Sequence, residues 1–387
     1  MSPVITCIED LRLLARKRAP KMFYDYADSG SWSAGTYRAN EADFQAIKLR
    51  QRVGVDMERR STTTALLGEP VAMPVVLAPV GGLGLQHADG ELLAARAAKA
   101  FGVPFTLSTV SVASIEDVAE ATGAHPFWFQ LYVLRDRAFI ADLIDRAKRA
   151  GCSALVLTMD LNVLGVRHKD LKNGLTDPSR MSLAHLAGIA ARPRWALGML
   201  RTPRRGFGNI IGHAAGVTDM KSFARWRGGV HDPTLNWADI DWVRQRWGGK
   251  LILKGIQDVD DARRAVQAGA DAIVVSNHGG RQLDGAESSI RALPAIVDAV
   301  GTKIEVHMDG GVRWGQDVLK AHALGARGVW IGRAYVYGLA ALGEAGVTKA
   351  LRMLHEELEL SMAFCGHTRI DEVGPHILVP GTAPATH

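Results

Sequence analysis

From about residue 70 onward, short apolar runs alternate with longer stretches of helical periodicity. The interiors of the apolar runs are nearly continuous in apolarity and rich in branched residues, as in Leu155–Thr158 and Ile273–Ser276. Such runs are typical of parallel strands that are buried on both faces. We therefore predict eight strands, at Val75–Ala78, Phe105–Thr109, Trp128–Tyr132, Ala154–Asp160, Leu251–Gly255, Ala272–His278, Glu305–Gly310 and Gly328–Gly332.

The stretches between these runs are predicted helices, and several of them end at a glycine, which suits a left-handed cap before the next strand. They include Gly90–Phe101, Arg137–Ala150, Val259–Ala268 and Gly315–Leu324. Eight strands with helical crossovers predict an α/β fold, a closed (β/α)8 TIM barrel. A doubly wound sheet is the rival, but it needs fewer strands and a Gly-x-Gly-x-x-Gly turn, which Gly81–Gly84 only loosely imitates.

Two segments depart from this regular alternation. Residues 1–70 are predicted to be a mainly helical N-terminal extension, with helices at Ile8–Arg18 and Asn40–Ile47, that lids one end of the barrel. The connection after strand four is far longer than an ordinary loop, so we expect a functional or mobile insert at about 175–235. We expect a single domain over 1–387, with the barrel at 71–345 and a C-terminal helix and tail at 346–387.

Composition narrows the setting. The 387 residues are 47% hydrophobic and 22% charged, which is typical of a globular protein with a full core. The three cysteines lie far apart and form no Cys-x-x-Cys pair, so we expect no disulfide framework and no metal site. Glu9 and Asp10 come too early for a secretory leader, no apolar run approaches a membrane span, and no basic-aromatic pattern indicates nucleic acid. A cytoplasmic location is the expectation.

Polar residues end seven of the predicted strands. Because the carboxyl ends of barrel strands form the active-site face, this pattern indicates binding or catalysis. The residues are Ser108 and Thr109, Gln130 and Tyr132, Thr158 and Asp160, Lys254, Ser276 and His278, Asp309, and Gly332 and Arg333.

His278 carries the sharpest hypothesis. A lone histidine is more often a satisfied core residue, but here two glycines and Arg281 follow it. The glycines let backbone approach a ligand, and the arginine fork suits a carboxylate. Asp160 is the candidate that orients the imidazole and raises its basicity.

Cations and glycines at other strand ends suggest an anionic ligand. Lys254 ends an apolar strand, where a lysine is costly unless it meets an anion, and a structural ion pair is the alternative. Asp309, Gly311 and Arg313 follow strand seven, and Gly332 and Arg333 follow strand eight. Many barrels build a phosphate site from these two loops.

Together these motifs resemble the flavin mononucleotide (FMN)-dependent L-2-hydroxy acid oxidases and dehydrogenases, and bacterial respiratory-type L-lactate dehydrogenases most of all. The similarity runs from about Phe23 to Gly343, and the stretch Ser276–Asp284 (SNHGGRQLD) is highly specific on its own. Other stretches that carry it are Phe23–Gly30, Ala78–Pro79, Leu107–Val112, Trp128–Arg137, Leu157–Asp160, Ile252–Gly255 and Ile331–Arg333.

The resemblance implies a role for each residue. His278 would be the base, assisted by Asp160; Arg281, Arg167 and Tyr26 would bind the substrate carboxylate; and Tyr132 would bond the hydroxyl or keto oxygen. The FMN contacts would be Ala78, Pro79, Val80, Gly81, Ser108, Gln130, Thr158, Lys254, Ser276, Asp309, Gly311, Arg313, Gly332 and Arg333. Relatives are commonly homotetramers. Whether hydrogen leaves Cα as hydride or through a carbanion stays open at this point.

His307 and Trp314 depart from the family pattern. His307 lies two residues before Asp309 in a strand that is usually apolar in relatives, so a hydrogen-bonded interior histidine is the favoured interpretation. Trp314 follows Arg313 where relatives often have a second arginine, so phosphate binding would depend more on Arg313 and Arg333.

The insert bears on the electron acceptor. From Pro178 to Thr218 there is no Asp or Glu, but there are six arginines (Arg180, Arg192, Arg194, Arg201, Arg204 and Arg205) among apolar residues that include Trp195. A basic amphipathic segment suits an anionic membrane surface, with a solvated loop as the alternative. On the membrane interpretation, FMN would pass electrons from a small 2-hydroxy acid, L-lactate above all, to a quinone or other respiratory acceptor. An oxidase that makes H2O2 from O2 and an inactive flavin-binding barrel are the competing hypotheses.

Overall fold

The computed structural model describes residues 4–175, 183–227 and 232–385 and contains the expected eight-stranded parallel barrel. The strand order is β3-β10-β9-β8-β7-β6-β5-β4, and a parallel bridge from Leu77 to Phe105 joins the two edge strands. The strands are β3 (Val75–Leu77), β4 (Thr106–Ser108), β5 (Trp128–Tyr132), β6 (Ala154–Thr158), β7 (Lys250–Ile256), β8 (Ala272–Val275), β9 (Glu305–Asp309) and β10 (Gly328–Ile331). Several predicted strands extended too far, because residues such as Asp160 and His278 belong to the loops that follow.

Alternation along the strands separates two apolar layers. Val76, Val156, Ile252 and Val274 pack with one another inside the barrel. Their neighbours, such as Leu155 and Leu253, belong to the larger core between barrel and helices. Successive side chains of a strand point to opposite faces, so a run that is apolar at every position fills both layers.

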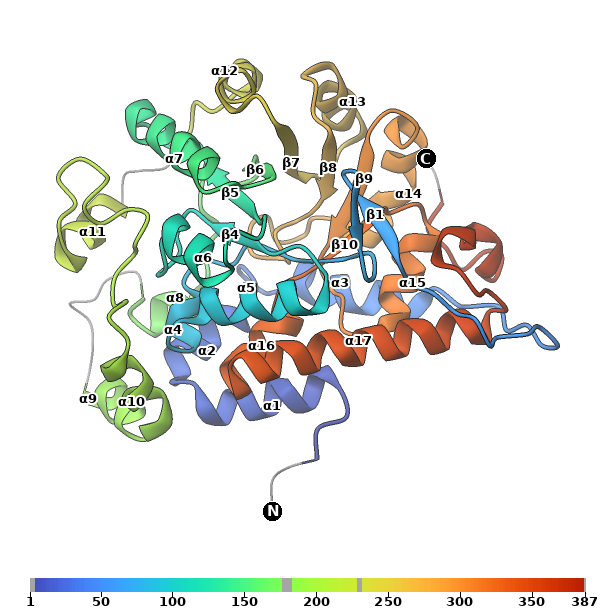
Figure 1. The fold of residues 1–387 in the computed structure, drawn as a ribbon, viewed down its shortest axis with the longest axis horizontal. Helices are drawn as coiled ribbons and strands as arrows, with labels where there is room; N and C mark the ends of the chain where they lie inside the picture. Colours follow the sequence, from blue (N-terminus) through green and yellow to red (C-terminus); the bar gives the residue numbers. More distant parts are fainter. Residues whose placement is uncertain (1–3, 176–182, 228–231, 386–387) are drawn as a thin grey trace.

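Helices surround the barrel (Figure 1). Eight follow the strands: α5 (Gly90–Phe101), α6 (Ile115–Ala121), α7 (Arg137–Arg149), α12 (Trp237–Trp247), α13 (Val259–Gln267), α14 (Ser289–Val300), α15 (Gly315–Ala323) and α16 (Arg333–Leu342). The long α17 (Glu344–Phe364) packs along α5, α15 and α16, and α1 (Ile8–Arg18) packs on α16. The tail continues with short helices at Ile370–Glu372 and Pro375–Ile377.

The N-terminal extension, which we predicted to lid one end of the barrel, contacts both ends. At the carboxyl end, α2 (Lys21–Ala27) and α3 (Gly35–Ala46) meet the loop after β8, where Ser31 N–H donates to Gly280 O at 2.9 Å. At the amino end, a hairpin of β1 (Thr64–Leu66) and β2 (Glu69–Val71) inserts Leu66 and Val71 into the interior cluster. The hairpin therefore closes the end opposite the site.

His307 lies inside the barrel as predicted, fully buried and hydrogen-bonded. Its Nδ1 accepts from Trp330 Nε1–H at 2.9 Å, so the ring proton lies on Nε2, which is 2.9 Å from Glu305 Oε2. Glu305 Oε1 in turn accepts from the N–H of Leu67 in the hairpin at 2.9 Å. The histidine thus connects the barrel interior to the hairpin.

The long insert lies between β6 and β7 on one flank of the barrel (Figure 1). After α8 (His168–Lys172) it contains α9 (Leu183–Ala190), α10 (Pro193–Arg201) and α11 (Met220–Arg227). Arg180 and the other residues of 176–182, with 228–231, fall outside the described residues. Among those described, no helix is both long and apolar enough to cross a membrane.

Candidate active site

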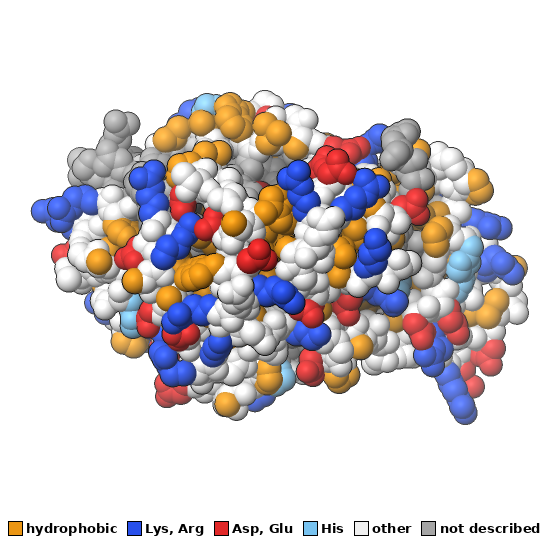
Figure 2. Space-filling view, turned by 90° about the horizontal axis from the view of Figure 1, so that it is seen from above, with side chains coloured by type: hydrophobic (Ala, Val, Ile, Leu, Met, Phe, Trp, Pro, Cys, Tyr) orange, Lys and Arg blue, Asp and Glu red, His pale blue; other side chains and the backbone are white. Residues whose placement is uncertain are grey.

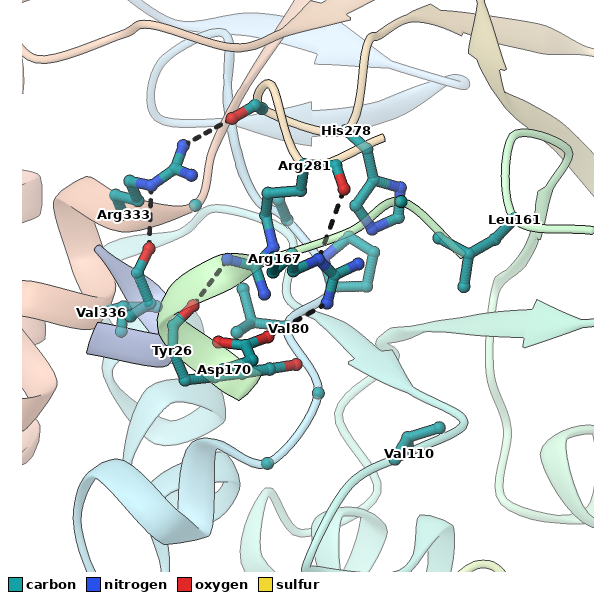
Figure 3. A pocket seen from close by; sticks show the side chains of 18 of the residues that line it. Tyr26, Val80, Val110, Leu161, Arg167, Asp170, His278, Arg281, Arg333 and Val336 are labelled. Carbon is teal, nitrogen blue, oxygen red and sulfur yellow. Dashed lines mark hydrogen bonds and ion pairs between the residues drawn. The ribbon is translucent and has the colours of Figure 1, made fainter. Parts of the chain in front are cut away.

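A cavity of about 470 Å³ opens at the carboxyl ends of the strands. Figure 3 shows Arg333 and Val336 on one side of it and Leu161 on the other, with His278, Arg281 and Arg167 between them. Fifteen of the predicted site residues line it: Tyr26, Ala78, Pro79, Val80, Gly81, Tyr132, Arg167, Lys254, His278, Arg281, Asp309, Gly311, Arg313, Gly332 and Arg333. The face predicted from strand ends is therefore one continuous site.

His278 lines the cavity and is hydrogen-bonded to Asp160, which does not line it. Nδ1 of His278 lies 3.1 Å from Oδ1 of Asp160, so Nδ1–H donates and Nε2 keeps its lone pair. Burial lowers the pKa of His278, and the Asp160 carboxylate partly offsets that effect. Burial acts to raise the pKa of Asp160, but His278 and Lys254 bring it below its ordinary value. The arrangement favours a neutral imidazole beside an ionised carboxylate.

Backbone conformation places this pair. His278 has φ +58°, in the left-handed region, which turns its side chain back toward the loop after β6. Gly255, at φ +102°, gives Asp160 its space, because a Cβ there would lie 2.6 Å from Cγ of Asp160. A side chain at Gly255 would displace the carboxylate that orients His278.

Three arginines gather next to His278. Arg281 lies 4.7 Å above the Tyr26 ring and donates to the backbone carbonyls of Tyr26 and Ser29. Arg167 donates to Arg281 O at 3.3 Å, and its other end lies 3.8 Å from the Asp170 carboxylate. Burial, with Arg167 and Arg333 nearby, lowers the pKa of Arg281 to about 10. Such crowded cations make the site attractive to an anion.

Tyr132 ends β5 on the same cavity wall. Burial first, then the charges of Tyr26 and Asp160, raise the pKa of its hydroxyl well above its usual range. It is therefore protonated at neutral pH and can donate a hydrogen bond to a ligand.

Lys254 and Asp309 meet across neighbouring strand ends. Lys254 Nζ lies 2.7 Å from Oδ2 of Asp309 and donates to Ser276 Oγ at 2.8 Å, and the lysine and aspartate are both buried. The ion pair that we gave as the alternative for Lys254 is thus present, and both members also line the cavity. Oδ1 of Asp309 has no partner among the described residues, although it is buried. A buried oxygen of this kind calls for a donor from a ligand.

Four predicted cofactor contacts lie behind the wall instead of lining it: Ser108, Gln130, Thr158 and Ser276. Ser108 Oγ donates to Gln130 Oε1 at 3.1 Å, and Gln130 Nε2 donates to Thr158 Oγ1 at 2.9 Å. Val110 N–H donates to Ser108 Oγ at 3.2 Å, so this series of hydrogen bonds supports the loop that carries Val110 to the cavity. Their contact with a cofactor stays a prediction.

At its far side the cavity is basic and rich in glycine. Arg313 pairs with Glu41 at 2.7 Å, and Arg333 donates to three backbone carbonyls, including Gly279 O at 2.9 Å. Gly311, at φ +86°, has no room for a Cβ, which would collide with the carbonyl oxygen of Asn40. Gly332 faces open space. Two arginines beside two glycines suit a phosphate group.

Sequence reasoning missed residues that the insert and nearby loops bring to the cavity. They are Leu134, Leu161, Leu164, Asp170, Phe207, Phe223 and Trp226. It also missed Asn209, which is fully buried and tied to the loop after β4. Asp170 stands three residues after Arg167, a spacing that could have suggested the ion pair. The aromatic residues gave no signal, because their docking depends on tertiary contacts.

Comparison with known proteins places this site in a family. A model of the FMN-dependent dehydrogenases matches residues 15–380. The chain belongs to the FMN-dependent dehydrogenase family. An L-lactate dehydrogenase of Caulobacter sp. (strain K31) is 46% identical over 377 residues, which cover 97% of this chain and 98% of that protein. One from Chromohalobacter salexigens is 45% identical over 385 residues, covering 99% and 97%.

Solved structures of 2-hydroxy acid enzymes resemble this chain over nearly its whole length. The monotopic membrane protein (S)-mandelate dehydrogenase is 36% identical, with a TM-score of 0.92 over 97% of this chain and 100% of that chain. Mandelate oxidase is 36% identical, with a TM-score of 0.82 over 97% and 98%. The enzyme is thus a flavoprotein oxidoreductase that uses FMN to oxidise a 2-hydroxy acid.

The residues present fit FMN. The unpartnered Oδ1 of Asp309 can accept from a ribityl hydroxyl, and the arginine and glycine side can take a phosphate. Ala78–Gly81 offer a largely apolar wall for a flat ring system, with Lys254 beside it. The side chains that line the cavity are therefore of the types that each part of the cofactor needs.

Proposed function

We propose that the enzyme oxidises L-lactate to pyruvate, with His278 as the base. The observation that carries this proposal is that His278, hydrogen-bonded to Asp160, faces the same cavity as Arg281, Arg167 and Tyr132. The relatives named L-lactate dehydrogenase support the substrate.

Each side chain has a part in the mechanism. Arg281 and Arg167, with Tyr26, bind the substrate carboxylate, and Tyr132 donates to its hydroxyl or keto oxygen. His278 Nε2 takes a proton, from the hydroxyl if hydrogen leaves as hydride and from Cα if a carbanion forms. In both cases the resulting imidazolium is stabilised by Asp160. FMN supplies the two-electron acceptor.

FMN would lie with its ring against Ala78–Gly81. Lys254 would face the edge where negative charge develops, which favours reduction. Asp309 would bind the ribityl chain, and Gly311, Arg313, Gly332 and Arg333 would surround the phosphate.

An anaerobic bleaching screen tests the substrate. The flavin absorbance would be followed after mixing with L-lactate, D-lactate, glycolate, L-mandelate or a longer 2-hydroxy acid. We expect L-lactate to bleach it fastest and D-lactate not to bleach it. Faster bleaching by L-mandelate would refute the substrate assignment, and an unbleached flavin with every acid would favour the inactive barrel.

We further infer that the electrons pass to a respiratory quinone and not to O2. Likeness to mandelate oxidase keeps the oxidase as a second candidate. After anaerobic reduction by L-lactate, air should reoxidise the flavin with a rate constant far below the turnover number of the enzyme. Reoxidation as fast as turnover would instead identify an oxidase.

Membrane contact through the insert is supported by α10. On this helix Leu197 is 47% exposed and Leu200 is 68% exposed. Arg194 and Arg201 are exposed as well. Trp195 does not join this face, because it stacks on Phe23 and donates to Leu85 O. Arg204 pairs with Asp89 and Asp117 and so is also engaged within the protein.

Vesicle sedimentation tests this contact. The face shown in Figure 2, which is the upper side of Figure 1 and not the side of α10, carries basic, acidic and hydrophobic side chains interspersed. We expect binding to vesicles with anionic lipid and a marked loss for Leu197→Glu/Leu200→Glu. Equal binding by the variant would refute the role of α10.

Gel filtration tests the predicted homotetramer.

A further inference from the structure

Three aromatic side chains of the insert form one wall of the cavity. Phe207, Phe223 and Trp226, which we call the aromatic wall, all line it. The rings of Phe207 and Phe223 stack with centroids 4.2 Å apart, and those of Phe223 and Trp226 lie 6.1 Å apart. Trp226 also meets Phe139 edge-on, at the start of α7. The wall is thus a packed aromatic group between the loops that follow β4 and β5.

The wall is fixed to the barrel next to the reaction site. Gly208 N–H donates to Val112 O at 3.1 Å, in the loop that carries Val110. Asn209 Nδ2 donates to Ser111 Oγ at 2.9 Å, and its Oδ1 accepts from Ile115 N–H at 2.9 Å. Because Asn209 is fully buried, these bonds hold this part of the insert in one position.

Charge divides the cavity into two regions. Arg281, Arg167 and His278 form the polar region that suits the carboxylate and hydroxyl of a small acid. The aromatic wall continues into aliphatic side chains, among them Leu134, Leu161 and Leu164. Figure 3 shows Leu161 and Val110 on the side away from Arg333. The methyl group of lactate is too small to cover three aromatic rings, so these rings offer an apolar surface that suits a second, flat ligand.

We propose that the aromatic wall receives the ring of a lipophilic quinone after the keto acid has left. This proposal rests on the proposed function, because it gives a site to the acceptor inferred there. The quinone takes the two electrons that substrate oxidation leaves on FMN, together with two protons, and departs as the quinol. The wall belongs to the same insert whose α10 exposes Leu197 and Leu200, so a ligand dissolved in a bilayer would meet this segment first.

The two half-reactions separate this site from the substrate site. Enzyme reduced anaerobically by L-lactate would be mixed with decylubiquinone or with ferricyanide, a hydrophilic acceptor. The readout is the rate constant of reoxidation by decylubiquinone divided by that of reoxidation by ferricyanide. In Trp226→Leu and Phe223→Leu we expect this ratio to fall about fivefold, since lost aromatic contacts are worth about 1 kcal/mol. Calorimetric titration of the oxidised enzyme with decylubiquinone should show weaker binding by the same factor.

Phe364→Leu is the matched control, because Phe364 is 63% exposed at the end of α17. Its ratio should equal that of the wild type, and melting temperatures would show that all variants fold. An unchanged ratio in both wall variants overturns the proposal. A loss confined to reduction by L-lactate also overturns it and assigns the wall to the substrate side chain. Failure of L-lactate to reduce the wild type would instead refute the proposed function, and any reducing acid could then prepare the enzyme for the quinone test.

Discussion

The imidazole Nδ1 of His278 lies 3.1 Å from one carboxylate oxygen of Asp160 and 3.3 Å from the other. The two residues come from loops after β8 and β6, 118 positions apart in the chain. Their contact decides the tautomer of the imidazole, and therefore which nitrogen is available to the substrate.

Replacing His278 by alanine should leave a yellow protein that L-lactate no longer reduces. The base is lost, but the FMN contacts on the other side of the cavity remain. We expect the anaerobic reduction rate to fall by about 10²–10⁴, the usual contribution of general base catalysis. Stopped-flow absorbance measures it, with bound FMN quantified in parallel. Near wild-type reduction would remove His278 from the mechanism.

The pH profile of kcat/KM should report His278. The base must be neutral, so activity falls as the pH is lowered through its pKa. Burial lowers that pKa, so the midpoint should lie below the ordinary histidine value of about 6.5. In Asp160→Asn the influence that raises the pKa is removed, so the midpoint should move to still lower pH while the plateau falls. A midpoint that moved to higher pH would contradict the assigned pairing.

Arg281→Lys should weaken substrate binding more than it slows chemistry. A lysine keeps the charge but loses the planar fork that pairs with a carboxylate. Loss of one charged hydrogen bond is worth about 1.5–3 kcal/mol, which corresponds to a rise in KM of roughly 10- to 100-fold. Steady-state kinetics on L-lactate give KM and kcat separately. Arg291→Lys, at an exposed pair with Glu287, is the control and should behave as the wild type.

Lys254→Met should destabilise the protein as well as release FMN. Lys254 and Asp309 are both buried, so the change leaves an uncompensated buried carboxylate, at a cost of about 3–5 kcal/mol. Urea unfolding without cofactor measures this cost, and flavin fluorescence measures FMN release. Lys250→Met is matched to it, because Lys250 is half-exposed and pairs with Asp271; it should cost less than about 1 kcal/mol. Equal effects of the two changes would argue against the buried pair.

The barrel and its polar strand ends could be predicted from the sequence because both signals are local. Continuous apolar runs give the strands, and the residue that ends each run gives the active-site face. His278, Asp160 and Lys254 were found in this way. The hairpin β1–β2 was missed, since each strand has only three residues and one contains Pro70.

What the insert contributes could not be predicted. Phe207 and Asn209 lie in a segment whose composition suggested a surface, yet both are buried. Their positions depend on contacts with loops far away in the chain. Trp195 shows the same effect, because a tryptophan in a basic segment turned inward onto Phe23.

The positive φ of His278 has a further consequence. A residue with a Cβ in the left-handed region costs about 1–2 kcal/mol, which glycine avoids. His278→Gly would remove this backbone strain, but it would also leave the buried Asp160 carboxylate without its imidazole partner. The strained backbone and the hydrogen bond to Asp160 therefore act on stability in opposite directions at one residue, so a stability-guided redesign of the enzyme would need to hold residue 278 fixed.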